Sequence, residues 1–171
     1  MTQTIGVARE VEAGERRVAV TPDRVNALGE LGFDVLVERG AGASAHFPDA
    51  RYQQAGAMLV ERREALGADV VVKIHRPTDD ELAHIKAGAT VIALRWPRQN
   101  EGLPARYADA GITGLALDAI PRISRAQPMD VLSSMAAIAG YRAVVEAAYE
   151  FGRYMSQQFT AAGSTEPARV L

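Results

Sequence analysis

The densest group of polar side chains lies in residues 121–134, PRISRAQPMDVLSS. This irregular stretch holds two guanidinium groups, an amide, a carboxylate and three hydroxyls, and it leads into a pattern typical of a helix. Such a mixture can bind ribose hydroxyls, phosphates or a carboxamide. A polar surface loop whose Asp or Ser caps the following helix would have the same composition, so the residue types alone leave both interpretations open.

Two further places combine charge with a position near the edge of a predicted sheet. Arg16 and Arg17 follow the first predicted strand and precede the first predicted helix, where open parallel sheets place ligand contacts. Lys73 lies inside the apolar run VVVKI, and a lysine buried there needs a partner or has to lose its charge. The alternatives are solvated or ion-paired surface arginines, and a lysine whose amine reaches solvent at the strand end.

Residues 39–45, RGAGASA, follow a predicted strand and partly match the glycine pattern of a dinucleotide-binding turn. Ala45 stands where that pattern needs its third glycine, and the next helix signal comes late, so we expect only a tight turn.

The histidines show no metal-ligand spacing, and the chain has no cysteine to join them. We therefore expect no metal site at His46, His75 or His84. Only His75, close to Lys73, could reach the same crevice at the sheet edge.

These candidates need a scaffold, and the chain alternates short β-branched runs with helical patterns over most of its length. This alternation predicts an α/β fold with a parallel sheet flanked by helices. We expect strands at residues 4–8, 34–38, 57–60, 69–74, 90–95 and 113–117. Helices are expected to begin near Pro22, Asp49 and Asp79, with a capping hydroxyl from Thr21. Glycines 32, 56, 88 and 111 should end helices in the left-handed conformation.

The last third of the chain has a different pattern. Apolar residues from 131 to 159 recur near helical spacing and predict one long helix, with Gly140 and Gly152 as close-packing or bending points. Residues 168–171 are typical of the first residues of another strand. We therefore predict an α/β domain over residues 1–130, followed over residues 131–171 by a long connecting helix and the start of a dinucleotide-binding domain that breaks off.

Composition excludes several classes of function. The 171 residues carry a formal charge of −2 without a basic stripe, so nucleic acid is not an expected partner. The chain lacks a signal pattern and a continuous apolar run of about 18 residues, so we expect a cytoplasmic protein that does not itself cross the membrane.

Several strings resemble one known family. Residues 5–10 (IGVARE), 15–22 (ERRVAVTP) and 37–42 (VERGAG) are similar to the N-terminal domain that alanine dehydrogenases share with transhydrogenase α subunits. Residues 96–100 (WPRQN), 122–127 (RISRAQ), 130–135 (DVLSSM) and 138–142 (IAGYR) resemble the transhydrogenase side specifically. The resemblance implies a flavodoxin-like domain in the NAD(H)-binding subunit of a proton-translocating NAD(P) transhydrogenase.

The resemblance also implies a site and partners. It assigns the bound nicotinamide nucleotide to the polar stretch: Arg122 and Gln127 would position the nicotinamide, and Asp130, Ser133 and Tyr141 would complete the contacts with NAD(H). The implied partners are a second copy of the chain and a membrane-embedded β subunit, or domain, that carries NADP(H). The protein would then lie in the cytoplasm, peripheral to the inner (plasma) membrane through its partner.

Two alternatives remain. Alanine dehydrogenases use an arginine, a lysine and a histidine for pyruvate; Arg17 and Lys73 match the first two, but the strand that ends at Trp96 offers no histidine. The second alternative is a truncated, non-catalytic fragment. The glycine-rich turn expected directly after Leu171 is absent, so we expect the isolated chain to be inactive and to bind NADH weakly.

Overall fold

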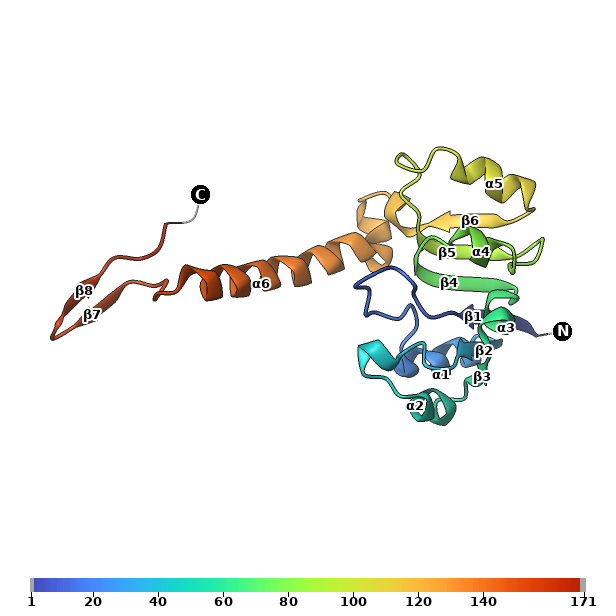
Figure 1. Ribbon diagram of the computed structural model, residues 1–171, viewed down its shortest axis with the longest axis horizontal. Helices are drawn as coiled ribbons and strands as arrows, with labels where there is room; N and C mark the ends of the chain where they lie inside the picture. The colour runs from blue at the N-terminus through green and yellow to red at the C-terminus, as the bar shows by residue number, and fades with distance from the viewer. Residues whose placement is uncertain (1, 170–171) are drawn as a thin grey trace. The chain divides into compact units, whose positions relative to one another are not determined.

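The computed structural model describes residues 2–169, and the chain divides into two compact units, Met1–Met129 and Asp130–Leu171. The first unit contains a six-stranded sheet (Figure 1), and every strand pair in it is parallel. Its strands are β1 (Gln3–Val7), β2 (Phe33–Glu38), β3 (Met58–Val60), β4 (Val70–His75), β5 (Thr90–Leu94) and β6 (Thr113–Ala116). The predicted class is confirmed, and each strand lies within one residue of its expected bounds.

The strand order is β3-β2-β1-β4-β5-β6, so the chain winds outward in both directions from the pair β1 and β4. This order is typical of dinucleotide-binding sheets and differs from the order 2-1-3-4-5 of flavodoxin. Open sheets of this kind bind ligands outside the carboxyl ends of the strands where the winding reverses. The topology therefore directs attention to the ends of β1 and β4.

Five helices belong to this unit: α1 (Pro22–Glu30), α2 (Asp49–Gln54), α3 (Arg62–Leu66), α4 (Asp79–Leu82) and α5 (Leu103–Asp109). The three predicted helix starts are confirmed, and the four predicted glycines all have positive φ. The predicted cap at Thr21 is wrong in one respect: Thr21 is the N-cap residue, but its hydroxyl makes no capping hydrogen bond. Thr78 does cap α4, in a reciprocal pair with Glu81.

The alternation of side chains along β1 separates two apolar layers. Ile5 and Val7 pack with Val35 and Val37 in the same core cluster as Val25 of α1. Gly6 faces the other way, where an added Cβ would lie 1.8 Å from the carbonyl oxygen of Ala65 in α3. Only glycine permits this approach of helix to strand, so helices cover both faces of the sheet.

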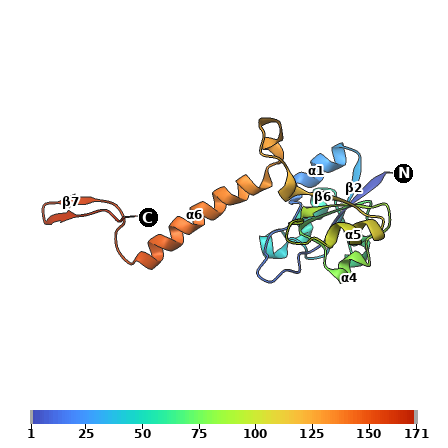
Figure 2. The same ribbon diagram turned by 90° about the horizontal axis from the view of Figure 1, so that it is seen from above.

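The second unit contains the helix α6 (Val131–Phe151) and a hairpin of β7 (Gln158–Thr160) and β8 (Gly163–Thr165) (Figure 2). The prediction of one helix to residue 159 is therefore wrong. Gly152 adopts a left-handed conformation, φ 65°, and ends the helix instead of bending it. Residues 168–169 are not in a strand, and the rest of the predicted strand, Val170 and Leu171, lies outside the described residues.

α6 is long and apolar enough to cross a membrane when judged by length and composition alone. One such helix is weak evidence for a membrane span, since helices covered by protein pass the same test. An ion pair between Arg142 and Glu146 lies in its middle turns.

Candidate functional site

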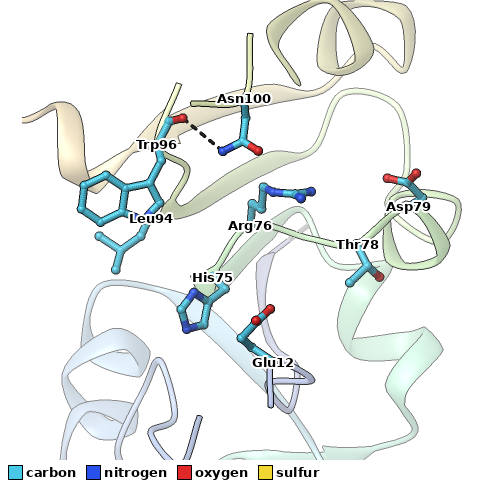
Figure 3. A pocket seen from close by; sticks show the side chains of 8 residues that line it. All are labelled: Glu12, His75, Arg76, Thr78, Asp79, Leu94, Trp96 and Asn100. Carbon is cyan, nitrogen blue, oxygen red and sulfur yellow. Dashed lines mark hydrogen bonds between the residues drawn. The ribbon is translucent and has the colours of Figure 1, made fainter. Parts of the chain in front are cut away.

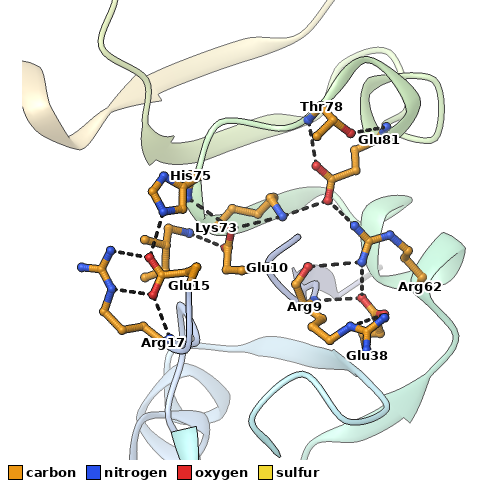
Figure 4. Close-up of polar contacts among 11 residues, drawn as sticks. Arg9, Glu10, Glu15, Arg17, Glu38, Arg62, Lys73, His75, Thr78 and Glu81 are labelled. Atoms are coloured by element: carbon orange, nitrogen blue, oxygen red, sulfur yellow. Dashed lines mark hydrogen bonds and ion pairs between the residues drawn. The ribbon is translucent and has the colours of Figure 1, made fainter. Parts of the chain in front are cut away.

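Three chain segments leave the sheet at its carboxyl edge, next to the point where the winding reverses. They follow the ends of β1 at Val7, β4 at His75 and β5 at Leu94. Charged side chains from the loop after β1, from the ends of β2 and β4 and from α3 and α4 form a continuous polar cluster (Figure 4).

Lys73 is the centre of the buried part of this cluster. Its side chain is 1% exposed, and its Nζ lies 2.9 Å from Glu81 Oε1 and 3.5 Å from Glu10 Oε2. Arg62 bridges Glu81 and Glu38, with 3.0 Å between its guanidinium and the Glu38 carboxylate. The expectation that a lysine in this strand needs a partner is confirmed, because Glu10 and Glu81 pair with it, and the alternative of an amine in solvent is wrong.

The carboxylate of Glu10 also holds the main chain at the end of β4. The N–H groups of Ile74 and His75 donate to its oxygens at 2.6 and 3.3 Å. One residue earlier in the loop, the N–H of Arg9 donates to Glu38 at 2.8 Å. The buried cluster therefore fixes the loop after β1 against β4, and its charges are satisfied within the chain.

Glu15, Arg17 and His75 form a second, more exposed group beside it. The guanidinium of Arg17 donates to both oxygens of Glu15, at 2.8 and 2.5 Å, and Nε2 of His75 lies 2.8 Å from the same carboxylate. The hydrogen bond from Arg17 outweighs burial and lowers the pKa of Glu15 to about 2. The same bond raises the pKa of Arg17.

The structure divides the predicted pocket of Arg17 and Lys73 between these two groups. Lys73 contacts Glu10 and Glu81, whereas Arg17 meets His75 through the shared carboxylate of Glu15. Within β4, it is therefore His75 and not Lys73 that shares a carboxylate with Arg17. Arg16 is exposed to solvent.

A cavity of about 470 Å³ opens between the ends of β4 and β5 (Figure 3). It is lined by Glu12, His75, Arg76, Thr78, Asp79, Leu94, Trp96 and Asn100. Of these, only His75 was predicted to reach the crevice.

Trp96 has an unusual backbone conformation at the mouth of this cavity. Its φ is +45°, a left-handed value that non-glycine residues rarely adopt. Its N–H donates to Asp118 at 3.0 Å, and its carbonyl accepts from the side-chain amide of Asn100 at 3.1 Å. Asp118 also accepts the N–H of Arg95 at 2.6 Å. Asp118 and Asn100 therefore hold the corner from both sides; sequence reasoning missed both, although Asp118 directly follows a predicted strand.

Arg95, the residue before Trp96, is buried under this corner. It is 7% exposed, and its guanidinium carbon lies 4.2 Å from the centroid of the Tyr107 ring. An added Cβ on Gly114 would lie 1.9 Å from Arg95 Nη1, so glycine in β6 makes room for the guanidinium. Within residues 2–169, Arg95 Nε has no hydrogen-bond partner, and stacking on Tyr107 is its main contact.

The polar stretch after β6 contributes to both units. Arg122 and Gln127 belong to the first unit, where both are exposed, while the buried Ala126 anchors the segment between them. In the second unit, Asp130 accepts the N–H of Ser133 at 3.0 Å and its hydroxyl at 2.6 Å, so these two cap α6. Tyr141 is 74% exposed on α6. Assignment of this stretch to a nucleotide stays a prediction.

The remaining candidates have structural explanations. Residues 39–45 form the predicted tight turn: the N–H of Gly40 donates to Asp49 at 2.8 Å, and Gly42 packs so closely on Tyr52 that a Cβ would lie 2.7 Å from its ring. His46 and His84 are exposed. Across residues 2–169, no group of three or more His, Asp or Glu side chains is arranged to hold a metal ion.

Comparisons with known proteins agree with this architecture. The model of the alanine dehydrogenase/PNT N-terminal domain matches residues 6–139. The chain is 48% identical to NAD(P) transhydrogenase subunit alpha of Haemophilus influenzae, over 98% of this chain and 33% of that protein. It superimposes on the crystal structure of transhydrogenase from Sinorhizobium meliloti with a TM-score of 0.91 and 44% identity, covering 97% of this chain and 50% of the other. Alanine dehydrogenase 1 of Staphylococcus aureus is more distant, at 30% identity over 85% of this chain and 38% of that protein. The chain thus spans a third to a half of the length of these relatives.

Proposed function

The chain belongs to the alanine dehydrogenase/PNT N-terminal domain family, and we propose that it is the N-terminal part of the NAD(H)-binding alpha subunit of a proton-translocating NAD(P) transhydrogenase. The observation that carries the proposal is the match to transhydrogenase over nearly the whole chain, in sequence and in fold, against a weaker match to alanine dehydrogenase. In this role the domain holds the nicotinamide end of NAD(H), while NADP(H) is carried by a partner.

The residues after β6 suit a nicotinamide. Arg122 and Gln127 present a guanidinium and an amide to solvent from a segment that the buried Ala126 anchors. These groups can donate to, and in the case of Gln127 accept from, a carboxamide. We assign them to orienting the ring, and we assign Asp130, Ser133 and Tyr141 to carboxamide or ribose contacts.

The nicotinamide supplies the hydride chemistry, and the chain's own residues have to orient it and exclude water. A general acid or base is not needed for direct hydride transfer. The charged groups at the sheet edge agree with this: Lys73 is paired with two carboxylates, and Glu15, with a pKa of about 2, stays ionised near neutral pH. They hold the main chain in place and are poorly suited to proton transfer.

The proposal includes partners. We propose a homodimer, docked on a membrane-embedded β subunit or NADP(H)-binding domain, which places the chain in the cytoplasm and peripheral to the inner membrane. The exposed apolar residues of α6 support contact with protein, because the charged pair of Arg142 and Glu146 in mid-helix would be costly in lipid. Hydride transfer would be coupled to proton translocation in the partner.

The test compares two assays on the longer protein that carries this domain. Transhydrogenation predicts NADH oxidation with an NADP analogue as acceptor; alanine dehydrogenase activity predicts NADH oxidation with pyruvate and ammonia instead. Activity with pyruvate and ammonia alone would overturn the proposal.

A calorimetric titration of the isolated chain with NADH adds a second test. We expect weak or undetectable binding, because the helix N-terminus that receives a pyrophosphate in this family would lie in a following domain. A submicromolar affinity of the isolated chain for NADH would contradict the assignment of the pyrophosphate site to a following domain. It would also contradict the interpretation of the chain as an inactive part.

A further inference from the structure

Trp96 has an unusual backbone conformation that hydrogen bonds with its neighbours hold in place. A non-glycine residue with φ of +45° is strained, and such strain persists only where neighbours enforce it. Asp118 and Asn100 enforce it here, yet 41% of the side chain remains exposed beside the cavity. A large aromatic ring fixed at a cavity mouth and left partly uncovered is suited to binding a planar ligand.

The charges around the cavity indicate which part of a nucleotide would fit. Its lining includes one arginine, Arg76, and two carboxylates, Glu12 and Asp79, of which Asp79 is paired with Arg106 at 2.5 Å. A pyridinium ring carries a positive charge that the face of an indole attracts.

Two polar groups of the lining are available for an amide. The side-chain nitrogen of Asn100 donates to the carbonyls of Arg95 and Trp96, both at 3.1 Å, which leaves its Oδ1 as an acceptor. Among residues 2–169, neither this oxygen nor the guanidinium of Arg76 forms a hydrogen bond with another side chain or carbonyl. An acceptor and a donor together match the NH2 and C=O of a carboxamide.

We propose that Trp96 is a ring-stacking residue for the nicotinamide, with Asn100 Oδ1 and Arg76 as contacts for its carboxamide. The inference rests on the proposed function and names a subsite of the same cofactor. Asp118, which accepts the N–H of Trp96, lies four residues before Arg122 in the chain.

The test uses the chain itself, because Trp96 is its single tryptophan. The probe is 1-methylnicotinamide, whose pyridinium ring quenches indole emission on contact. We expect saturable quenching with an unchanged fluorescence lifetime, the sign of a complex formed before excitation. Acetamide, an amide without a ring, should not quench.

Variants separate stacking from folding, with binding measured by saturation-transfer NMR of the probe. Trp96→Gly removes the ring but suits the backbone, and it should weaken binding about five- to tenfold, the size of one aromatic contact. Trp96→Phe should retain most of the affinity. Arg76→Met should weaken binding, whereas Arg98→Met, an exposed arginine outside the cavity lining, should not.

Unsaturable quenching, or unchanged affinity in Trp96→Gly, would overturn the stacking assignment. The proposed function has a separate readout in the hydride-transfer rate of Arg122→Ala and Gln127→Ala in the longer protein. If these variants are impaired while Trp96→Gly binds normally, the subsite is wrong and the proposed function stands. If none has an effect, both the subsite and the roles of Arg122 and Gln127 are wrong. The proposed function itself fails if the longer protein oxidises NADH with pyruvate and ammonia alone.

Discussion

The two units of the chain hide their apolar residues in different ways. In the first unit Val7, Val37, Val71 and Val91 are fully buried between sheet and helices. In the second unit α6 has no buried residue, although most of its side chains are apolar. The first unit therefore has its own core, whereas the stability of the second has to come from a surface that covers α6, since isolated helices are marginal in water.

The ion pairs of the two units should differ most in their effect on stability. Lys73→Met removes the cation between Glu10 and Glu81, and leaving buried carboxylates unpaired should lower the free energy of unfolding by about 3–5 kcal/mol. Arg142→Met in α6 breaks an exposed pair with Glu146 and should cost at most about 0.5 kcal/mol. Urea denaturation measures both. Equal costs would mean that the buried cluster is not the scaffold described above.

Truncating an apolar side chain in each unit compares their stability without changing any charge. Leu66→Ala should lower the free energy of unfolding by about 2–5 kcal/mol, because Leu66 is fully buried. Ile138→Ala, at a residue 62% exposed, should change it by less than about 0.5 kcal/mol in dilute protein.

Repeating the measurement on Ile138→Ala at several protein concentrations tests whether a second copy covers α6. If a second copy covers α6, the cost of Ile138→Ala should rise at protein concentrations where sedimentation shows dimers. A large cost that does not depend on concentration would contradict the idea that a second copy covers α6.

Each unit has a residue with a left-handed backbone conformation, and substitutions there should have a smaller effect on stability. Gly152 ends α6 at φ 65° without strain, whereas Trp96 at φ 45° is strained. Trp96→Gly should therefore be more stable than Trp96→Ala by about 1 kcal/mol, the reverse of the usual order of these residues. Thermal unfolding of the two variants tests this directly, and an alanine variant as stable as the glycine variant would show that the corner relaxes.

The smallest effect is a pH dependence confined to the first unit. Because the pKa of Glu15 falls from 4.5 to about 2 in the folded chain, its contribution to stability is complete above about pH 4.5 and is lost as the pH falls towards 2. Glu15→Gln should flatten the stability curve across that window. Glu12→Gln, an exposed change in the same loop, is the matched control variant.

The local sequence pattern was sufficient to predict the strands of the sheet but not the elements of the second unit. The six strands alternate with helix signals at short range, and each was predicted within one residue. The end of α6 was missed because apolar spacing continues past Gly152 to Phe159, and spacing alone cannot distinguish a bend from a left-handed cap. The hairpin was missed because β7 begins inside the stretch that this spacing assigns to the helix.

Site residues were predictable where the chemistry is local. A lysine within an apolar strand signals a need for partners, but Glu10 is 63 positions away in sequence, and only the pairing of β1 with β4 brings it close. Trp96 was visible in the sequence as part of the WPRQN string and at the end of a strand without a histidine, but not as a residue of the cavity. Its φ depends on Asp118, a long-range contact that no pattern near residue 96 contains.

The central claim, that the stretch after β6 positions a nicotinamide for hydride transfer, is tested most directly by a single-turnover rate. The measurement uses the longer protein with its membrane partner, NADH as donor and an NADP analogue as acceptor. Arg122→Ala and Gln127→Ala should slow transfer by roughly 100-fold, the effect of a misplaced reactant, while Arg125→Ala, exposed in the same stretch, should stay near the unmodified rate. Unmodified rates in the Arg122 and Gln127 variants, or an equal loss in all three, would contradict the claim.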